Sequence, residues 1–262
     1  MTATGSLPLN PIEESLASLP HRVAMCADSA RGLASDFVWD AQDAYLFDVD
    51  GTLLRSADRT HVDSFAEAVE QVTGDTISLD GVTLHGGTDT AILAEAFARS
   101  GVNFGTLETH CAAILERMAE IVETRRTELR FRRMPGVLEI LKWLQAKGAL
   151  LGVATGNLER IGWTKLEACG LHGWFALGGF SDRFPVREEL VGDAAERART
   201  MLGRSQARVC VVGDTPRDIE AARANELAVI AVATGNYSFD ELERLKPEVC
   251  CSSLTALMEW RR

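Results

Sequence analysis

The chain has 262 residues, 46% of them hydrophobic and 25% charged, so it is long enough for one large α/β domain with a smaller inserted one. Its formal net charge of −11 argues against binding nucleic acid or an anionic membrane surface through a general positive field. No apolar run reaches the roughly 18 residues of a membrane span, and the N-terminus lacks the pattern of a secretory signal, so we expect a cytoplasmic protein.

The cysteines carry no metal-site spacing, because none forms a CxxC pair or a Cys/His cluster. They are Cys26, Cys111, Cys169, Cys210, Cys250 and Cys251. Most of them stand in apolar surroundings. We therefore expect buried free thiols in a reducing compartment.

The N-terminal extension, residues 1–38, is rich in small residues, and Pro8 and Pro11 break its first stretch. Its pattern predicts no more than short helices over 12–19 and 23–34. We assign this extension no function.

The first strong strand is predicted over 44–47, an apolar run that leads into Asp48-Val49-Asp50-Gly51. This pattern is typical of a buried parallel strand with a site at its carboxyl end. Residues i and i+2 of a strand point to the same side, so Asp48 and Asp50 should project together. Two close carboxylates favour either a bound divalent metal or a division into nucleophile and acid/base. A lone pair of this kind is also typical of a solvated strand end or a turn cap.

Helical spacing replaces the strand pattern over a stretch of about 70 residues, predicted to be a helical insertion at 59–132. The longest helix in it is expected over 106–128. The loop at 84–90 contains paired glycines that allow close approach, so it is a candidate to face a site. The alternative is an ordinary helix start capped by Thr88 or Asp89.

Strands and helices alternate again after Pro135-Gly136, which predicts a parallel sheet with helices on both faces. We therefore expect a Rossmann-like α/β core formed by 39–58 and 133–262. The predicted helices are 136–147, 158–169, 188–202 and 216–224, and the predicted strands are 149–155, 175–179, 208–213 and 228–232. A short helix, a short strand near 249–251 and a final helix complete the chain.

The segment Phe47-Asp48-Val49-Asp50-Gly51-Thr52 resembles the first motif of the haloacid dehalogenase superfamily, a strand followed by DxDGT. The resemblance extends over about 43–235. It implies the Rossmann-like core, and it implies that the helical insertion is a cap over the active site. This position of the cap resembles the subgroup that includes phosphoglycolate phosphatase and β-phosphoglucomutase.

The family's second motif is a Ser or Thr at a strand end that hydrogen-bonds the transferring phosphoryl group. Thr155, within Ala154-Thr155-Gly156-Asn157, fits that motif. A hydroxyl beside free backbone N–H groups at a strand-to-helix turn is a natural anion site, although helix capping alone produces the same pattern. The residues expected to contact substrate beside Thr155 are Gly51, Thr52, Gly156 and Asn157.

The last motif of the family, GDxxxD, is matched by Gly213-Asp214-Thr215-Pro216-Arg217-Asp218. Alone, this segment could be a helix N-terminus capped by acid. The resemblance implies that Mg2+ is held by Asp48, the backbone carbonyl of Asp50 and Asp214. Asp218 is expected to support the site or to hold one of the ion's waters.

The family's third motif is a Lys or Arg before a helix, often followed by Pro, and this chain has no such Lys-Pro. Arg187 is the best placed candidate for the cation, because an arginine can bind phosphate oxygens bidentately. Arg183 is the rival, and a plain surface arginine is the remaining alternative.

The resemblance implies a mechanism in which Asp48 attacks phosphorus and forms an aspartyl-phosphate. Asp50 would protonate the leaving alcohol and then deprotonate the hydrolytic water, while Thr155 and Arg187 stabilise the phosphoryl oxygens. Dehalogenases of the family lack the second aspartate, so Asp50 favours phosphoryl transfer. We therefore expect a Mg2+-dependent phosphatase that acts on a small phosphorylated metabolite, either phosphoglycolate-like or a sugar phosphate.

Two alternatives to the phosphatase remain. A phosphomutase would need a cap that binds a second phosphate. Arginines near the end of the insertion could provide that site, but they are equally typical of a solvated helix face and hinge. They are Arg125, Arg126, Arg130, Arg132 and Arg133. A non-catalytic binding protein would normally lack Asp48 or Asp50. A phosphonatase would need a cap lysine, and none lies between Arg59 and Arg133. Whether the protein is a monomer or a homodimer is not predicted.

Overall fold

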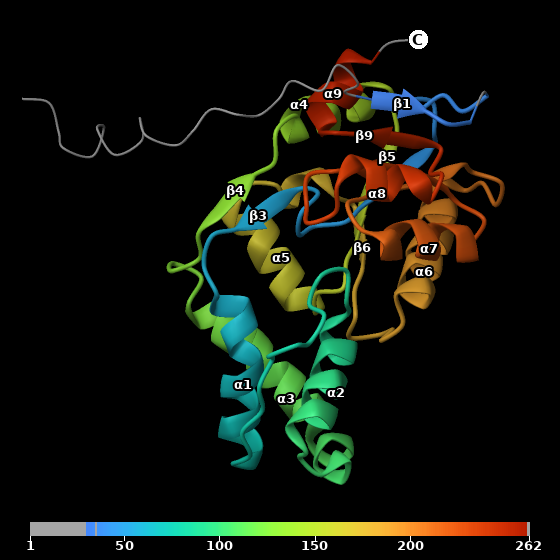
Figure 1. The fold of residues 1–262 in the computed structure, drawn as a ribbon. Coiled ribbons are helices and arrows are strands. Elements are labelled where there is room, and N and C mark those ends of the chain that lie inside the picture. Colours follow the sequence, from blue (N-terminus) through green and yellow to red (C-terminus); the bar gives the residue numbers. More distant parts are fainter. Residues whose placement is uncertain (1–29, 35, 261–262) are drawn as a thin grey trace, which may run out of the picture.

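The computed structural model describes residues 30–34 and 36–260, whose core is a seven-stranded sheet in the order β1-β9-β8-β7-β2-β5-β6 (Figure 1). All neighbouring strands are parallel except β1, which pairs antiparallel with β9 at the edge. The strands are β1 (Ala30–Gly32), β2 (Ala44–Phe47), β5 (Leu150–Ala154), β6 (Leu177–Gly179), β7 (Val209–Gly213), β8 (Ala228–Val232) and β9 (Val249–Cys251).

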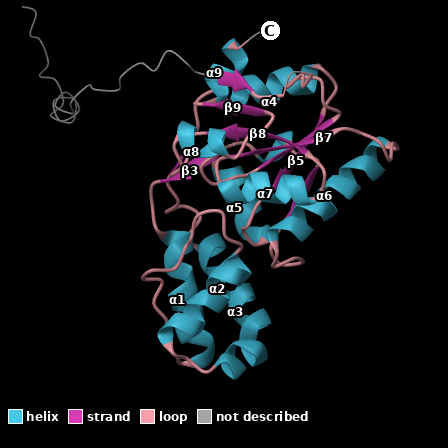
Figure 2. Cartoon of the chain, turned by 45° about the vertical axis from the view of Figure 1, so that its right-hand side comes forward, coloured by secondary structure: helices cyan, strands magenta, loops and turns pink. Residues whose placement is uncertain are grey.

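Helices cover both faces of this sheet, because successive side chains of each buried strand point to opposite faces (Figure 2). In β2, Tyr45 and Phe47 join one apolar cluster and Leu46 joins another. The first cluster is completed by α4 (Val137–Ala146), α5 (Glu159–Ala168) and α9 (Leu254–Glu259). The second is completed by α6 (Arg187–Leu202), α7 (Pro216–Ala224) and α8 (Phe239–Arg244).

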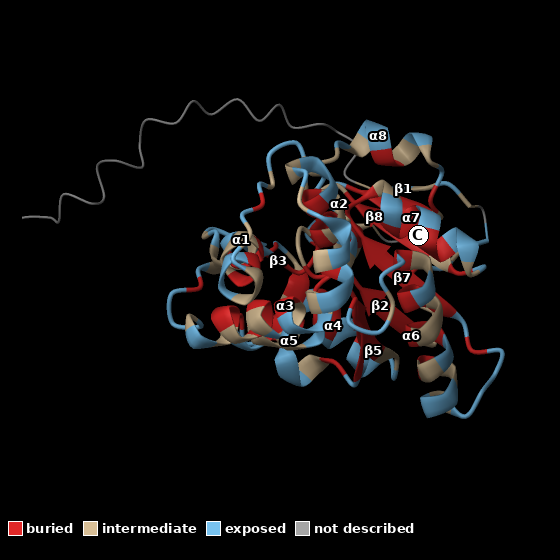
Figure 3. Cartoon of the chain, turned by 90° about the horizontal axis from the view of Figure 1, so that it is seen from below, coloured by how far each residue is buried: buried red, intermediate tan, exposed pale blue. Residues whose placement is uncertain are grey.

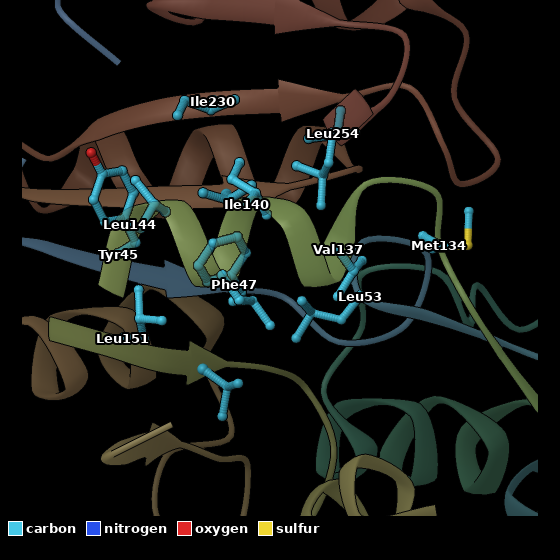
Figure 4. Packing of buried hydrophobic residues seen from close by; sticks show 14 of the residues in the cluster. Tyr45, Phe47, Leu53, Met134, Val137, Ile140, Leu144, Leu151, Ile230 and Leu254 are labelled. Atoms are coloured by element: carbon cyan, nitrogen blue, oxygen red, sulfur yellow. The ribbon is translucent and has the colours of Figure 1, made fainter. Parts of the chain in front are cut away.

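The sheet is the most deeply buried part of the molecule. Figure 3 shows its central strands as buried, with exposed residues on the outer faces of the helices. Figure 4 shows the first cluster, in which Ile140 and Leu144 of α4 lie over Tyr45 and Phe47 of β2. This packing fixes the position of the residues that directly follow β2, beginning with Asp48.

Three helices form a separate unit with its own apolar core: α1 (Thr60–Thr73), α2 (Asp89–Ser100) and α3 (Phe104–Thr124). They lie below the sheet in Figure 1. A two-stranded antiparallel sheet of β3 (Leu54–Ser56) and β4 (Phe131–Arg133) joins this unit to the rest of the chain. Leu158 and Ile161, at the start of α5, belong to the unit's apolar core, so the three helices pack against the large domain near the ends of its strands.

The predicted parallel α/β sheet with helices on both faces is confirmed, and the elements after residue 133 agree with prediction to within two residues at each end. The helix expected over 23–34 is wrong in its described part, because Ala30–Gly32 pairs with β9 as an edge strand. The helix expected over 12–19 lies outside the described residues. The β3–β4 pair was not predicted, since each strand has three residues and its partner is distant in sequence.

The cysteines within the described residues are free thiols, and all of them are buried except Cys111, which is partly exposed. Cys26 lies outside the described residues. Burial raises the pKa of the Cys169 thiol and raises that of Cys250 to about 12. No helix within 30–34 and 36–260 combines the length and the hydropathy that crossing a membrane requires.

Candidate active site

A cavity of about 410 Å³ lies at the carboxyl ends of the central strands, within the size range of small-molecule sites. β2 lies between β5 and β7, so the residues that follow these three strands meet at one edge of the sheet. The large domain lines the cavity with Asp48, Asp50, Thr155, Asn157, Lys165, Arg187 and Asp214 among others. The helical unit and its loop line it with His61, Val62, Phe65, Leu84, His85 and Ile92 among others.

Three buried carboxylates gather on one side of the cavity. Asp48, Asp214 and Asp218 each place a carboxylate oxygen within 4.8 Å of the others. Burial raises the pKa of Asp48 to about 7, because the opposing charge of Arg187 does not offset it and Asp218 adds to it. Burial, followed by repulsion from Asp48 and Asp218, also holds the pKa of Asp214 well above its ordinary value. These three groups therefore crowd negative charge in a place that favours a cation.

The donors around Asp214 fit a small, hard divalent cation such as Mg2+, which prefers carboxylate oxygen. The backbone closes tightly around this carboxylate: a Cβ on Gly235 would lie 1.7 Å from Asp214 Oδ2, and one on Gly51 would lie 2.4 Å from it. Gly51 also has φ of +95°, which a residue with a side chain rarely adopts. Thr52 donates a 2.9 Å hydrogen bond to Asp214 Oδ1 and fixes its rotamer. The closeness of the backbone leaves no room for a side chain at Gly51 or Gly235 beside Asp214.

Arg187 is the cation that faces these carboxylates. It opens α6, is buried, and donates from Nη2 to Asp48 Oδ1 at 2.8 Å and to Asp218 Oδ1. Its Nη1 donates to the Gly86 carbonyl at 3.3 Å, whereas its Nε finds no acceptor in the described part of the chain. Burial would lower the pKa of the guanidinium, but the charges of Asp218 and Asp48 outweigh burial and raise it. Arg183 does not line the cavity.

Asp50 lies in an environment opposite to that of Asp48. Its Oδ2 accepts hydrogen bonds from Lys165 Nζ at 2.7 Å and from Asn157 Nδ2 at 2.8 Å. Burial acts to raise the pKa of Asp50, but the Lys165 ammonium and these two hydrogen bonds outweigh it, and the pKa is lowered. Asn157 Nδ2 also donates to Thr155 Oγ1 at 2.7 Å, so the amide links the second motif to the first. The two carboxylates, two residues apart, therefore differ in environment: burial raises the pKa of Asp48, whereas the Lys165 ammonium and two hydrogen bonds lower that of Asp50.

Lys165 is the site residue that the sequence interpretation missed. Its side chain is 3% exposed, and it stands on the buried face of α5 with Ile161 and Leu166. A lysine at a position that the helical period assigns to the core was the available signal, because lysine is almost never buried without a partner. The partner, Asp50, lies 115 residues away in the sequence, so local patterns could not reveal it.

The loop before α2 reaches from the helical unit into the large domain. Asp89 donates from its backbone N to the Gly156 carbonyl at 2.7 Å, and its buried Oδ2 accepts from the Leu158 backbone N at 2.8 Å. A Cβ on Gly156 would lie 2.0 Å from the Gly87 carbonyl oxygen, so only glycine permits this approach. The loop therefore both faces the cavity and starts a helix, with Thr88 as the N-cap.

His61, on α1, also reaches the cavity, with Nε2 3.1 Å from Asp89 Oδ2.

Two of the predicted site residues, Thr52 and Asp218, do not line the cavity. Asp218 instead accepts from the Thr215 backbone N and hydroxyl through Oδ2, completing the N-cap of α7, and holds Arg187 through Oδ1. No member of the arginine cluster at 125–133 lines the cavity. In that cluster, Arg125 pairs with Glu67 of α1.

Comparison with known proteins assigns the family. The model of the haloacid dehalogenase-like hydrolases matches residues 42–225. A phosphoglycolate phosphatase of Mesorhizobium japonicum is 31% identical over 126 residues, covering 48% of this chain and 55% of the relative. One from Agrobacterium fabrum is 33% identical over 128 residues, covering 48% and 53%. The matched region thus spans about half the length of these curated relatives.

Solved structures share the fold. The crystal structure of a predicted phosphoglycolate phosphatase from Haemophilus somnus superposes with a TM-score of 0.59 at 19% sequence identity, covering 83% of this chain and 97% of that one. The match of the family model to most of the chain carries the assignment. This protein belongs to the haloacid dehalogenase-like hydrolase family.

Proposed function

We propose that this protein is a Mg2+-dependent phosphatase that hydrolyses a small phosphorylated metabolite through an aspartyl-phosphate on Asp48. The observation that carries the proposal is the arrangement of Asp48, Arg187 and Asp50 around one cavity of about 410 Å³. Phosphoryl transfer of this kind requires three groups. They are a nucleophile, a cation for the phosphoryl oxygens, and an acid/base residue whose electrostatic environment differs from that of the nucleophile.

Each group has a role that follows from its contacts. Asp48 is the nucleophile, because it lies at the end of β2 beside the buried guanidinium of Arg187. Arg187 and Thr155, which both line the cavity, bind the phosphoryl oxygens. Asp50 gives a proton to the leaving oxygen and later takes one from the attacking water.

The metal would be held by Asp48 and Asp214, with the backbone carbonyl of Asp50, while Asp218 would support the site by orienting Arg187. When bound there, Mg2+ supplies positive charge that offsets the repulsion between the Asp48 carboxylate and the phosphate. Asp214 is oriented for this role by the hydrogen bond from Thr52.

Residues 59–132 act in this proposal as a cap that excludes water and contacts the leaving group. Support comes from His61, Phe65 and His85, which line the cavity from the helical unit and its loop. The cavity, at about 410 Å³, has room for a phosphoglycolate-like compound or a sugar phosphate. The activity named for the curated relatives favours the phosphoglycolate-like substrate.

The experiment is phosphate release from a panel of phosphorylated metabolites, including phosphoglycolate and hexose phosphates, with Mg2+ or with EDTA. We expect phosphate release in Mg2+ that falls by at least about 10²-fold in EDTA, because the metal offsets the charge of the developing transition state. Release that is unchanged in EDTA would contradict the role of the metal. Accumulation of an isomer of a sugar phosphate without free phosphate would contradict hydrolysis and favour a mutase.

A further inference from the structure

A buried lysine lies behind the acid/base residue of the site. Lys165 extends from the inner face of α5, with Nζ 2.7 Å from Asp50 Oδ2 and 2.7 Å from Asn157 Oδ1. The lysine side chain is 3% exposed, whereas that of Asp50 is 41% exposed. The ion pair therefore joins a fixed cation inside the domain to a carboxylate that faces the cavity.

The contacts of Asp50 are asymmetric. Both of its side-chain hydrogen bonds reach Oδ2, one from Lys165 and one from Asn157. Its Oδ1 accepts no side-chain or backbone hydrogen bond from the residues that the structure describes. Oδ1 is therefore the oxygen available to a ligand, and the two bonds to Oδ2 determine where it points.

Without Lys165, Asn157 could not fix the orientation of the Asp50 carboxylate. Its Nδ2 is shared between Asp50 Oδ2 and Thr155 Oγ1, and its Oδ1 accepts from Lys165. The lysine thus orients the amide as well as the carboxylate. Among the described residues, Asp50 is the only carboxylate within ion-pair distance of Lys165, so this pairing serves the site.

We infer that Lys165 is a positioning residue for catalysis: its ammonium group locks the Asp50 carboxylate and the Asn157 amide in the orientation that presents Asp50 Oδ1 to the leaving oxygen. The inference rests on the proposed acid/base role of Asp50. Lys165 acts through Asp50, so its loss should slow the reactions that depend most on proton transfer to the leaving group. Esters with a good leaving group need that proton less and should be nearly unaffected.

The test compares Lys165→Met with wild type on an alkyl phosphate, the best substrate of the panel, and on an aryl phosphate such as p-nitrophenyl phosphate. kcat/KM reports the steps through the first chemical step. We expect kcat/KM for the alkyl phosphate to fall by about 10²-fold, within the range of general acid catalysis, and that for the aryl phosphate to fall by less than about fivefold. Lys147→Met is the matched control, because Lys147 forms a similar pair with Asp40, 2.6 Å away and outside the cavity, and both values should stay unchanged.

A second comparison guards against a folding defect. Lys165→Gln keeps a polar group near Asn157 and removes the charge, and it should show the same selective loss with a melting temperature near that of wild type. In an Asp50→Asn background, Lys165→Met should cause almost no further loss on the alkyl phosphate, since the two residues act as one unit.

Equal losses on both esters, or additive losses in the double variant, would overturn the positioning role and leave the proposed phosphatase activity intact. An unchanged Lys165→Met enzyme would do the same. A wild-type protein that releases phosphate from neither ester would overturn the proposed function and this inference with it.

Discussion

Replacing Asp48 with Asn is expected to lower kcat for phosphate release by at least about 10⁴-fold, the scale on which removal of a covalent nucleophile acts. The amide has nearly the same shape as the carboxylate and can still accept from Arg187 Nη2, so the site should keep its geometry. It carries no charge to attack phosphorus. Steady-state phosphate release with the best substrate of the panel measures the effect.

The same substitution should leave the melting temperature, measured in EDTA, unchanged or higher. Asp48 crowds with Asp214 and Asp218, and burial raises its pKa to about 7, so a neutral side chain relieves repulsion among the carboxylates. Asp63→Asn is a suitable control, because Asp63 is exposed on α1 and lies outside the cavity. An Asp48→Asn protein that is folded and retains more than about a tenth of wild-type kcat would exclude Asp48 as the nucleophile.

Replacing Arg187 with Met is expected to lower the free energy of unfolding by about 3–5 kcal/mol in EDTA. Arg187 is 5% exposed and pairs with both Asp48 and Asp218, so its loss leaves two buried carboxylates without a counter-charge. Urea denaturation in EDTA measures the difference. Activity should also fall, since no other arginine of the described residues pairs with Asp48.

Mg2+ should return part of the stability lost in Arg187→Met, because an ion that binds only the folded protein stabilises it and would pair with Asp48 and Asp214. The matched control is Arg183→Met, four residues earlier and outside the cavity, with an expected change within about 0.5 kcal/mol. Equal stability of Arg187→Met and wild type in EDTA would show that the carboxylates do not need the guanidinium, and it would contradict the charge arrangement described above.

Much of the large domain was predictable because its strands are fully buried. β2, β5 and β7 are apolar runs that end in glycine or are followed by polar residues, and that pattern predicts a parallel sheet with a site at its carboxyl edge. The acidic residues after β2 and β7 could be placed at the same edge for the same reason. The alternation of strands and helices then determines which strand ends can be neighbours.

Other features depend on contacts between distant segments. β3 and β4 are three residues long and pair across the whole helical unit, so neither has a periodic signal of its own. The pKa values of Asp48 and Asp50 diverge because burial raises the first and Lys165 on α5 lowers the second, and both causes exist only after folding. The choice between Arg187 and Arg183 likewise depends on where α6 begins relative to the cavity.

Trapping the intermediate would show whether Asp48 carries the phosphoryl group during turnover. The protein would be mixed with Mg2+ and its best substrate, quenched in acid, digested, and analysed by peptide mass spectrometry. We expect a phosphorylated peptide in which Asp48 bears the modification, present during turnover and absent in the Asp48→Asn protein. A phosphoryl group on another residue, or steady turnover with no phosphorylated peptide under the same quench, would contradict this role of Asp48.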